Sequence, residues 1–131
     1  MKPLYMPLLI IFYMIPAAIA VDPIDKVAEL IRQGNTRELS KIFAETVEIT
    51  MQDEENVYSK VQAGLILDKF FSQNKPVSVK MLHKVNSNPN YLFAVLIVNT
   101  QKGPFRIGYT LKETEGSLAL IELRIETEKV K

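Results

Sequence analysis

An unbroken apolar run in the second half of the chain constrains the fold most. Leu92 to Val98 contains only apolar residues, many of them β-branched or aromatic, with Asn-Pro-Asn shortly before it and Lys-Gly-Pro shortly after it. A run this short between turn residues is typical of a strand that is buried on both faces. Such a strand needs neighbouring strands to pair with and cover on each face, so the rest of the chain must supply both.

Length, charge and cysteine content limit the class of protein. The chain has 131 residues, which is typical of one domain, and its formal net charge is +1. Without the first twenty residues, whose one charge is Lys2, basic and acidic residues are equal in number, so nucleic-acid binding has no electrostatic basis. The absence of cysteine excludes disulfides, thiolate metal sites, a cysteine nucleophile and a lipoprotein anchor.

Residues 1–20 have the pattern of a secretory signal peptide. Lys2 provides the positive n-region, Leu4 to Ile15 is almost wholly apolar, and Ala18-Ile19-Ala20 has the small residues that signal peptidase reads. The alternative is an uncleaved anchor, but the prolines and the alanine-rich end favour cleavage. We therefore expect an exported protein, periplasmic or secreted, that begins near Val21 and keeps no membrane anchor.

Helix start and stop signals predict two short helices next. Asp22 is a suitable N-cap with Pro23 at the first helical position, and Gly34 is suited to end the helix in the left-handed conformation. Asn35 and Glu38 have the spacing of a capping box, so a second helix follows at once. Its expected buried face consists of Leu39, Ile42 and Phe43.

A strand and a longer helix are expected after these. Thr46 to Met51 alternates between apolar and polar residues, as a half-buried strand does. Asp53 to Asn56 is expected to be a solvated turn, because the ligand spacing and the glycine of a calcium loop are missing.

Ser59 caps a third helix that reaches about Gln73. Its apolar residues span a wide arc, so we expect burial of Val61, Leu65, Ile66, Leu67, Phe70 and Phe71.

Only strands and short polar turns are expected from there to the C-terminus. The connections are short and two of them contain glycine, which favours an antiparallel meander. The expected strands are Val77 to Val85, Tyr91 to Gln101, Phe105 to Lys112 and Leu118 to Glu126. The fold class is therefore α+β, with three N-terminal helices, a strand inserted before the third, and an antiparallel sheet on which they pack.

The element order and several short motifs resemble a known superfamily. The motifs are Tyr58-Ser59-Lys60 with Gln62-Ala63, Phe70-Phe71 with Asn74 and Pro76, Leu82-His83-Lys84, Phe105-Arg106-Ile107, and Ile121 to Glu126. The order resembles the nuclear transport factor 2-like, or cystatin-like, superfamily. The motifs resemble a small family of secreted bacterial proteins filed as a domain of unknown function. One departure is Val85-Asn86, where the resemblance implies a glycine.

The resemblance covers roughly residues 22 to 127 and implies one domain over residues 21–131. In this fold a strongly curved sheet wraps the long helix into a cone with a cavity at its open end. Enzymes and plain binding modules share the fold, so the resemblance does not decide between them.

The candidates for acid–base catalysis are His83 and Asp68. His83 is the one histidine of the chain, and strict alternation places it on the apolar face of its strand with Met81 and Val85. An inward-facing imidazole near the Asp68 carboxylate would form a dyad suited to proton transfer. The alternatives are a buried structural histidine, and an aspartate at the edge of the apolar arc that pairs with Lys69 or with solvent.

A ligand cavity on the inner face of the sheet would be lined by residues of the third helix and the strands. Tyr109 follows Phe105 at period two, so its ring would line the wall and its hydroxyl could donate a hydrogen bond to a ligand. The alternative for Tyr109 is aromatic core filler with its hydroxyl at the rim. The full set of candidate ligand-binding residues is His83, Tyr109, Phe105, Met81 and Phe70.

The opposite face of the last two strands carries alternating charges. These outward positions are Arg106, Lys112, Glu122, Arg124 and Glu126, with Gly108 among them where the sheet bends. They form either cross-strand ion pairs or a face for a partner.

Three functional hypotheses remain. The first is an exported, non-catalytic module that binds a small apolar ligand or a partner protein in the cell envelope, without metal or cofactor. The alternative is a cofactor-free isomerase or hydrolyase that uses His83 with Asp68 or Tyr109. Motifs for phosphate, zinc or dinucleotide binding and for a nucleophile elbow do not occur in the sequence. A homodimer through the exposed face or edge of the sheet is a third, surface-only role.

Overall fold

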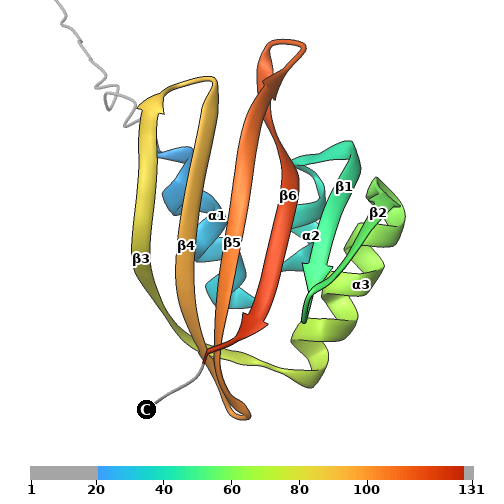
Figure 1. The fold of residues 1–131 in the computed structure, drawn as a ribbon, viewed down its shortest axis with the longest axis vertical. Helices are drawn as coiled ribbons and strands as arrows, with labels where there is room; N and C mark the ends of the chain where they lie inside the picture. The colour runs from blue at the N-terminus through green and yellow to red at the C-terminus, as the bar shows by residue number, and fades with distance from the viewer. Residues whose placement is uncertain (1–20, 129–131) are drawn as a thin grey trace, which may run out of the picture.

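Within residues 21–128, six strands form one sheet in the order β2-β1-β6-β5-β4-β3, and three helices pack on one of its faces. The computed structural model describes residues 21–128, so the predicted signal peptide lies outside the described residues. In Figure 1 the sheet faces the viewer, α1 and α2 lie behind it, and α3 lies at its right-hand edge. The elements are α1 (Pro23–Gln33), α2 (Thr36–Ser40), β1 (Phe43–Met51), β2 (Glu54–Ser59), α3 (Lys60–Gln73), β3 (Pro76–Asn88), β4 (Tyr91–Thr100), β5 (Gly103–Thr114) and β6 (Ser117–Thr127).

The α+β class and the antiparallel meander from β3 to β6 are confirmed, but the sheet as a whole is mixed. β1 runs parallel to β6, with Ile49 opposite Leu123, so the prediction of a wholly antiparallel sheet is wrong in this part. α3 and the meander separate these two strands in the chain, and that long connection lets the last strand pair with the first in the parallel direction.

A strand that the sequence does not signal, β2, forms where a polar turn was expected. The turn is shorter and comes earlier, at Gln52 and Asp53, which both have positive φ angles of 50° and 71°. Two successive residues of this kind are typical of a tight hairpin turn, and Glu54 begins the strand directly after them. β2 is an edge strand with mostly exposed side chains, so it lacks the apolar alternation that marks β1.

The predicted ends of α1 and the predicted start of α3 are confirmed by the capping contacts. The Asp22 side chain accepts a hydrogen bond from the Ile24 N–H, and Gly34 ends α1 with a φ of 66°. Ser59 and Gln62 form a reciprocal capping box at the start of α3. α2 is shorter than predicted, because Phe43 already belongs to β1.

The predicted wide apolar arc of α3 is only partly buried. Ala63, Leu67 and Phe71 face the core, whereas Val61 and Leu65 are exposed. α3 packs against β1, β2 and the five-residue α2, and this short helix leaves the outer side of α3 open.

The core cluster of the described residues extends from Ile24 to Ile125, so a chain that starts at Val21 contains all of it.

No helix within residues 21–128 is long and apolar enough to cross a membrane.

The N-cap of α1 gives a prediction for stability. Asp22→Ala is expected to lower the free energy of unfolding by about 0.5–2 kcal/mol, because the first-turn N–H of Ile24 loses its acceptor. Lys84 Nζ lies 2.8 Å from Asp22 Oδ2, and its hydrogen bond holds the pKa of Asp22 below the ordinary 3.8. A lowered folded-state pKa means that the stabilisation by the Asp22 carboxylate and Lys84 is present above pH 3.8. It is lost as the pH falls below that value.

Urea unfolding of Asp22→Ala and Asp22→Asn at pH 7 and pH 3 measures the contribution of the capping hydrogen bond and that of the charge interaction with Lys84. Asp22→Asn keeps a capping oxygen and removes the charge, so it should retain most of the stability at pH 7. Equal losses in the two variants would show that the cap itself contributes little.

Candidate functional site

His83 lies on the helix-free face of the sheet. Between Met81, which pairs with Leu96, and His83, which pairs with Val95, the register of β3 shifts by one residue at Leu82. A bulge of this kind exchanges the faces of all residues beyond it, because side chains alternate with period two. His83 is therefore exposed on the opposite side from the helices, and the expectation that it points inward is wrong.

Asp68 is on the helical side, so the structure does not bring the two catalytic candidates together. Its Oδ1 accepts a hydrogen bond of 2.8 Å from Thr36 Oγ1 of α2. This contact joins α3 to α2 and gives the carboxylate a structural role. Within residues 21–128 no group of three or more His, Cys, Asp or Glu side chains could hold a metal ion.

Tyr109 is part of the core, with its side chain almost wholly buried. Its hydroxyl donates a hydrogen bond of 2.7 Å to the Ile24 carbonyl oxygen at the start of α1. Burial raises the pKa of the phenol, and the nearby carboxylates Asp25 and Asp22 raise it further. The expected hydroxyl at a cavity rim is therefore not found. Met81 is also engaged, since its half-buried side chain packs against the core.

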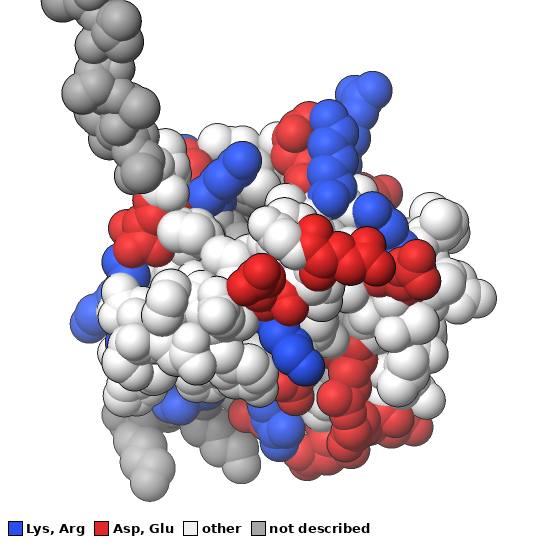
Figure 2. Space-filling model, turned by 90° about the horizontal axis from the view of Figure 1, so that it is seen from above, with Lys and Arg blue, Asp and Glu red and all other residues white. Residues whose placement is uncertain are grey.

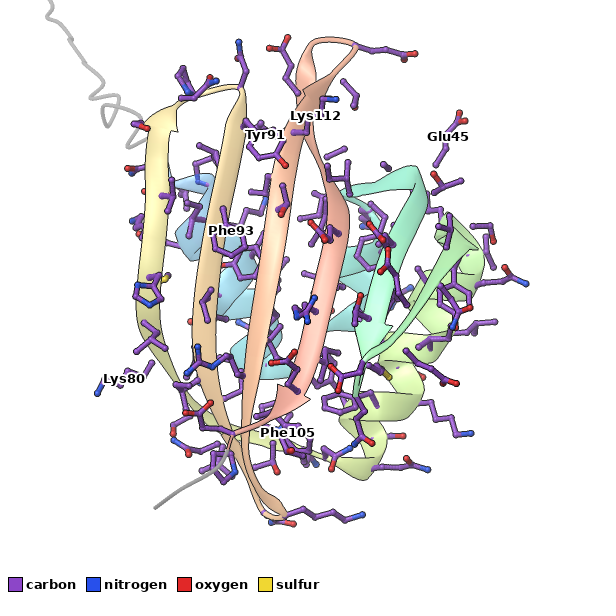
Figure 3. The ribbon with its side chains drawn as sticks, in the orientation of Figure 1. Glu45, Lys80, Tyr91, Phe93, Phe105 and Lys112 are labelled. Carbon is purple, nitrogen blue, oxygen red and sulfur yellow. The ribbon has the colours of Figure 1, made fainter. Side chains whose placement is uncertain are left out.

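Two of the predicted ligand-binding residues, Phe70 and Phe105, do meet in an open cleft. The Phe70 ring of α3 and the Phe105 ring of β5 are in edge-to-face contact, with centroids 5.0 Å apart and planes at 83°. The cleft has a volume of about 470 Å³ and lies where the C-terminal end of α3 approaches the end of the sheet marked by Phe105 in Figure 3. It is lined by Met51, Gln52, Glu54, Phe70, Gln73, Asn74, Phe105, Ile125 and Thr127.

The rim of this cleft is polar and nearly uncharged. Gln52 and Glu54 come from the β1–β2 hairpin, and Gln73 and Asn74 come from the end of α3. Asn74 is held in place, since its side-chain amide donates a hydrogen bond of 2.9 Å to the Phe70 carbonyl oxygen. Sequence reasoning missed the hairpin residues because it assigned that segment to a solvated turn.

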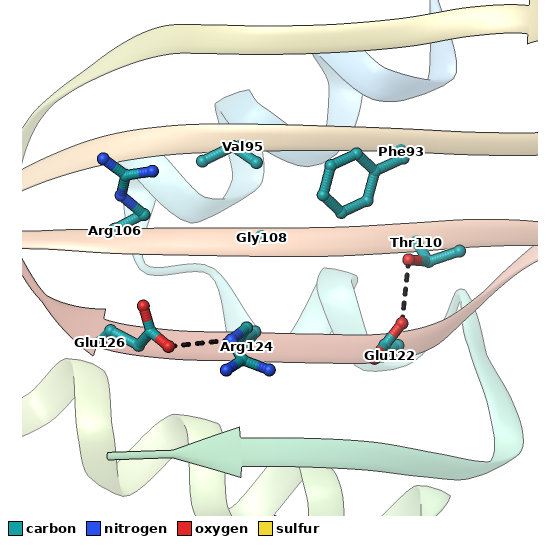
Figure 4. A pocket seen from close by; sticks show the side chains of 8 residues that line it. All are labelled: Phe93, Val95, Arg106, Gly108, Thr110, Glu122, Arg124 and Glu126. Carbon is teal, nitrogen blue, oxygen red and sulfur yellow. Dashed lines mark hydrogen bonds and ion pairs between the residues drawn. The ribbon is translucent and has the colours of Figure 1, made fainter. Parts of the chain in front are cut away.

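A second hollow lies on the helix-free face of the sheet. It has a volume of about 250 Å³, and Figure 4 shows Phe93, Val95 and Gly108 at its apolar part with charged side chains around them. Thr110 Oγ1 donates a hydrogen bond of 3.2 Å to Glu122 Oε1, and Arg124 Nε lies 2.8 Å from Glu126 Oε2.

Arg106, on the same face, pairs with Glu128 at 2.9 Å and lowers the pKa of that carboxyl group. Of the expected cross-strand ion pairs, Arg106 finds its partner just past the end of β6, whereas Arg124 and Glu126 pair along the same strand and Glu122 accepts a hydrogen bond from Thr110.

The charge distribution has no block of basic side chains on the end of the molecule shown in Figure 2. Lys and Arg side chains there lie beside Asp and Glu side chains, with uncharged atoms between them. This mixed surface agrees with the balanced charge of the sequence.

Comparison with known proteins identifies the family. Residues 24–126 match the family described as Domain of unknown function (DUF4783). No curated protein matches the chain.

Solved structures of the same family share the fold. A DUF4783 family protein from Bacteroides uniformis has a TM-score of 0.78 at 22% identity, over 83% of this chain and 100% of that one. One from Bacteroides ovatus has a TM-score of 0.75 at 23% identity, over 88% and 97%.

A more distant similarity concerns the fold. An NTF-2 like protein of unknown function from Silicibacter pomeroyi has a TM-score of 0.58 at 11% identity, over 80% of this chain and 89% of that one. At these identities the similarity shows the fold alone, and this fold is the nuclear transport factor 2-like one that the resemblance implied. The chain belongs to the DUF4783 family of that fold.

Proposed function

We propose that this protein is an exported, non-catalytic binding module of the cell envelope. Its ligand is a small molecule with an aromatic or other compact apolar group, and the binding site is the cleft between α3 and the sheet. The observation that carries the proposal is the edge-to-face pair of Phe70 and Phe105 at the base of an open cleft.

The size and lining of the cleft support a small-molecule ligand. Its volume of about 470 Å³ is within the usual range for ligand pockets, roughly 300–1,000 Å³. Phe70, Phe105, Met51 and Ile125 supply apolar contact area, while amide groups at the rim can orient a polar end by hydrogen bonds. A ligand that places a ring against Phe70 and Phe105 would extend an aromatic cluster that already exists.

The charge at the rim of the cleft determines which polar group of a ligand is favoured. Glu54 is the one charged side chain among the described residues that line the cleft. A carboxylate attracts a cation and repels an anion, and for solvent-exposed groups this is worth about 0.2–1 kcal/mol. The favoured ligand therefore carries an amine or a neutral polar group, and an anionic end is disfavoured.

The arrangement of titratable groups favours binding over acid–base catalysis. Proton transfer requires an acid or base within hydrogen-bond reach of the reacting group. His83 lies on the helix-free face, Asp68 is bonded to Thr36, and the hydroxyl of Tyr109 is bonded inside the core. None of the three lines the cleft.

A set of three probes with the same phenyl ring tests the proposal. They are 2-phenylethylamine, 2-phenylethanol and 3-phenylpropionate, titrated into residues 21–131 with affinities obtained from NMR chemical shifts. The amine should bind about 1.4 to 5 times more tightly than the alcohol, and the carboxylate most weakly, because of the charge on Glu54. Glu54→Gln should remove the difference between the amine and the alcohol while the alcohol still binds.

Matched aromatic variants provide the control. Phe70→Leu should weaken all three probes, whereas Phe93→Leu, on the other face of the sheet, should leave them unchanged. Weaker binding in Phe93→Leu with unchanged binding in Phe70→Leu would contradict the assignment of the cleft. A preference for the carboxylate that Glu54→Gln does not alter would contradict it as well.

A further inference from the structure

The outer side of α3 exposes a short apolar stripe. Val61 is 73% exposed and Leu65, one helical turn further on, is 65% exposed. Within residues 21–128 they are the two large apolar side chains of a helix that are exposed. Residues four positions apart lie on the same side of a helix, so the two side chains are neighbours. The short α2 ends at Ser40 and leaves them uncovered.

A groove between α2 and α3 runs along this stripe. It has a volume of about 450 Å³ and is lined by Thr36, Arg37, Ser40, Lys60, Val61, Gly64, Leu65 and Asp68. The two helices are antiparallel along it, since Thr36 contacts Asp68 and Ser40 lies beside Gly64. From Lys60 to Asp68 the α3 wall is about 12 Å long at 1.5 Å per residue, which is slightly more than two helical turns.

Gly64 in the middle of the α3 wall is not required by the packing of the two helices. A Cβ atom there would lie 3.4 Å from Ser40 Cβ, its nearest neighbour, which is an ordinary van der Waals contact. A glycine inside a helix destabilises it relative to alanine, and it permits close approach of another group to the backbone. The glycine therefore keeps the groove open at its centre.

The charges along the groove favour an acidic partner. Arg37 and Lys60 line it, and within residues 21–128 neither of them forms an ion pair. Lys60 is also the first residue of α3, where the helix dipole adds positive potential. The one acidic lining residue, Asp68, already accepts a hydrogen bond from Thr36. The groove thus has a net positive charge that complements carboxylate groups.

Other occupants fit this groove less well. The terminal segments of the chain have the wrong charge, because Lys2 is the one charged residue of the first twenty and residues 129–131 contain Lys129 and Lys131. A small molecule is disfavoured, since its sites enclose most of the ligand surface, whereas the apolar wall of this groove is largely exposed.

We propose that the groove between α2 and α3 binds an acidic, amphipathic helix of a partner protein. Apolar residues of the partner, spaced three and four apart, lie on Val61 and Leu65 and over Gly64, and flanking Asp or Glu side chains pair with Arg37 and Lys60. A helix that packs into the groove between two others follows ordinary ridge-and-groove packing and is a common mode of peptide recognition.

This interaction is separate from the ligand cleft. The cleft lies at the C-terminal end of α3 and shares no lining residue with the groove. The groove is short, so the contact area is small and the association is expected to be weak and transient.

Two matched synthetic peptides of about 16 residues, long enough to form a helix, test the proposal. One has leucines spaced three and four apart with glutamates beside them, and the other has lysine in place of each glutamate. Both are titrated into residues 21–131 and followed by amide chemical shifts. Because the lining has one net positive charge, the glutamate peptide should bind about 2 to 25 times more tightly. The largest shifts are expected at Ser40, Gly64 and Leu65.

Variants of the groove identify the contacts. The double variant Arg37→Glu with Lys60→Glu should reverse the preference, so that the lysine peptide binds more tightly. Leu65→Ala should raise the dissociation constant of the glutamate peptide at least about threefold, because it removes buried apolar contact. Val57→Ala is the matched control, since Val57 is 67% exposed and does not line the groove. Circular dichroism confirms that each variant is folded.

Several results would overturn the proposal. They are no saturable binding of the glutamate peptide at about 1 mM, equal affinity for the two peptides, or shifts confined to residues outside the groove. Sedimentation velocity of the protein alone tests for a second copy as the occupant, and self-association that Leu65→Ala abolishes would assign the groove to that copy instead. Binding to phospholipid vesicles that Leu65→Ala abolishes would assign it to a membrane surface.

Discussion

Leu67→Ala is expected to lower the free energy of unfolding by about 2–5 kcal/mol. Leu67 is 1% exposed in the middle of α3, where the helix packs against β1 and β2. Removal of its side chain forfeits the transfer free energy of the buried methyl groups and leaves a cavity that a packed core fills only in part. For a domain of marginal stability this is a large fraction of the total, so urea unfolding should show a clearly lower midpoint.

Leu65→Ala is the matched control two residues away. The Leu65 side chain is 65% exposed, and surface substitutions of this kind usually change stability by less than about 0.5 kcal/mol. The sequence predicts burial of both leucines, so this pair of variants distinguishes the observed orientation of α3 from the predicted one. Equal losses in the two variants would show that α3 is covered on its outer side as well.

Substitution of Tyr109 is expected to give the second large loss in the free energy of unfolding. Tyr109→Ala is expected to lose about 3–5 kcal/mol, because a fully buried aromatic ring is removed from β5 beneath α1. Tyr109→Phe keeps the ring and removes only the hydrogen bond to the Ile24 carbonyl oxygen, so about 0.5–1.5 kcal/mol is expected. Thermal or urea unfolding of the two variants measures the difference.

The phenol also makes stability depend on pH. Burial raises the folded-state pKa of Tyr109 above the unfolded value of about 10, so its stabilising effect is complete below pH 10 and is lost as the pH rises above that value. The loss is at most about 1.4 kcal/mol per pH unit. The advantage of the wild type over Tyr109→Phe should therefore shrink or reverse between pH 8 and pH 11. A constant difference would mean that the hydroxyl is in contact with solvent.

The meander and the helix caps could be predicted because their signals are local. Asp22, Gly34 and Ser59 act within one turn of helix, and the apolar alternation of β5 follows from burial of one strand face. The apolar run of β4 was expected to be buried on both faces, but the helices cover only one of them, and Phe93 on the other face is 36% exposed. β2 could not be predicted in this way. It is stabilised by pairing with β1 and not by its own apolar residues, so no periodic pattern marks it.

The position of His83 shows how one extra residue in a strand changes the site that is inferred from the sequence. Strict alternation along β3 places it with Met81, but the bulge at Leu82 transfers it to the other face. Lys84 is moved to the helical side by the same shift, where it contacts Asp22 and Asp25. A bulge depends on the partner strand, so the sequence of β3 alone does not reveal it.

The proposed ligand cleft contains two of the residues that the sequence analysis selected. Phe70 and Phe105 were both candidate ligand-binding residues, and the structure places their rings in contact. The polar rim could not be predicted, because Gln52 and Gln73 are brought together by the hairpin turn and by the end of α3, which lie far apart in the sequence.

The central claim is that a small molecule binds in the cleft between α3 and the sheet. Intermolecular nuclear Overhauser effects between 2-phenylethylamine and residues 21–131 test this claim most directly, because they report which protons of the protein lie within about 5 Å of the ligand ring. We predict contacts from the phenyl ring to Phe70, Phe105 and Ile125. Contacts to Phe93 and Val95 on the helix-free face, without any to Phe70, would contradict the account.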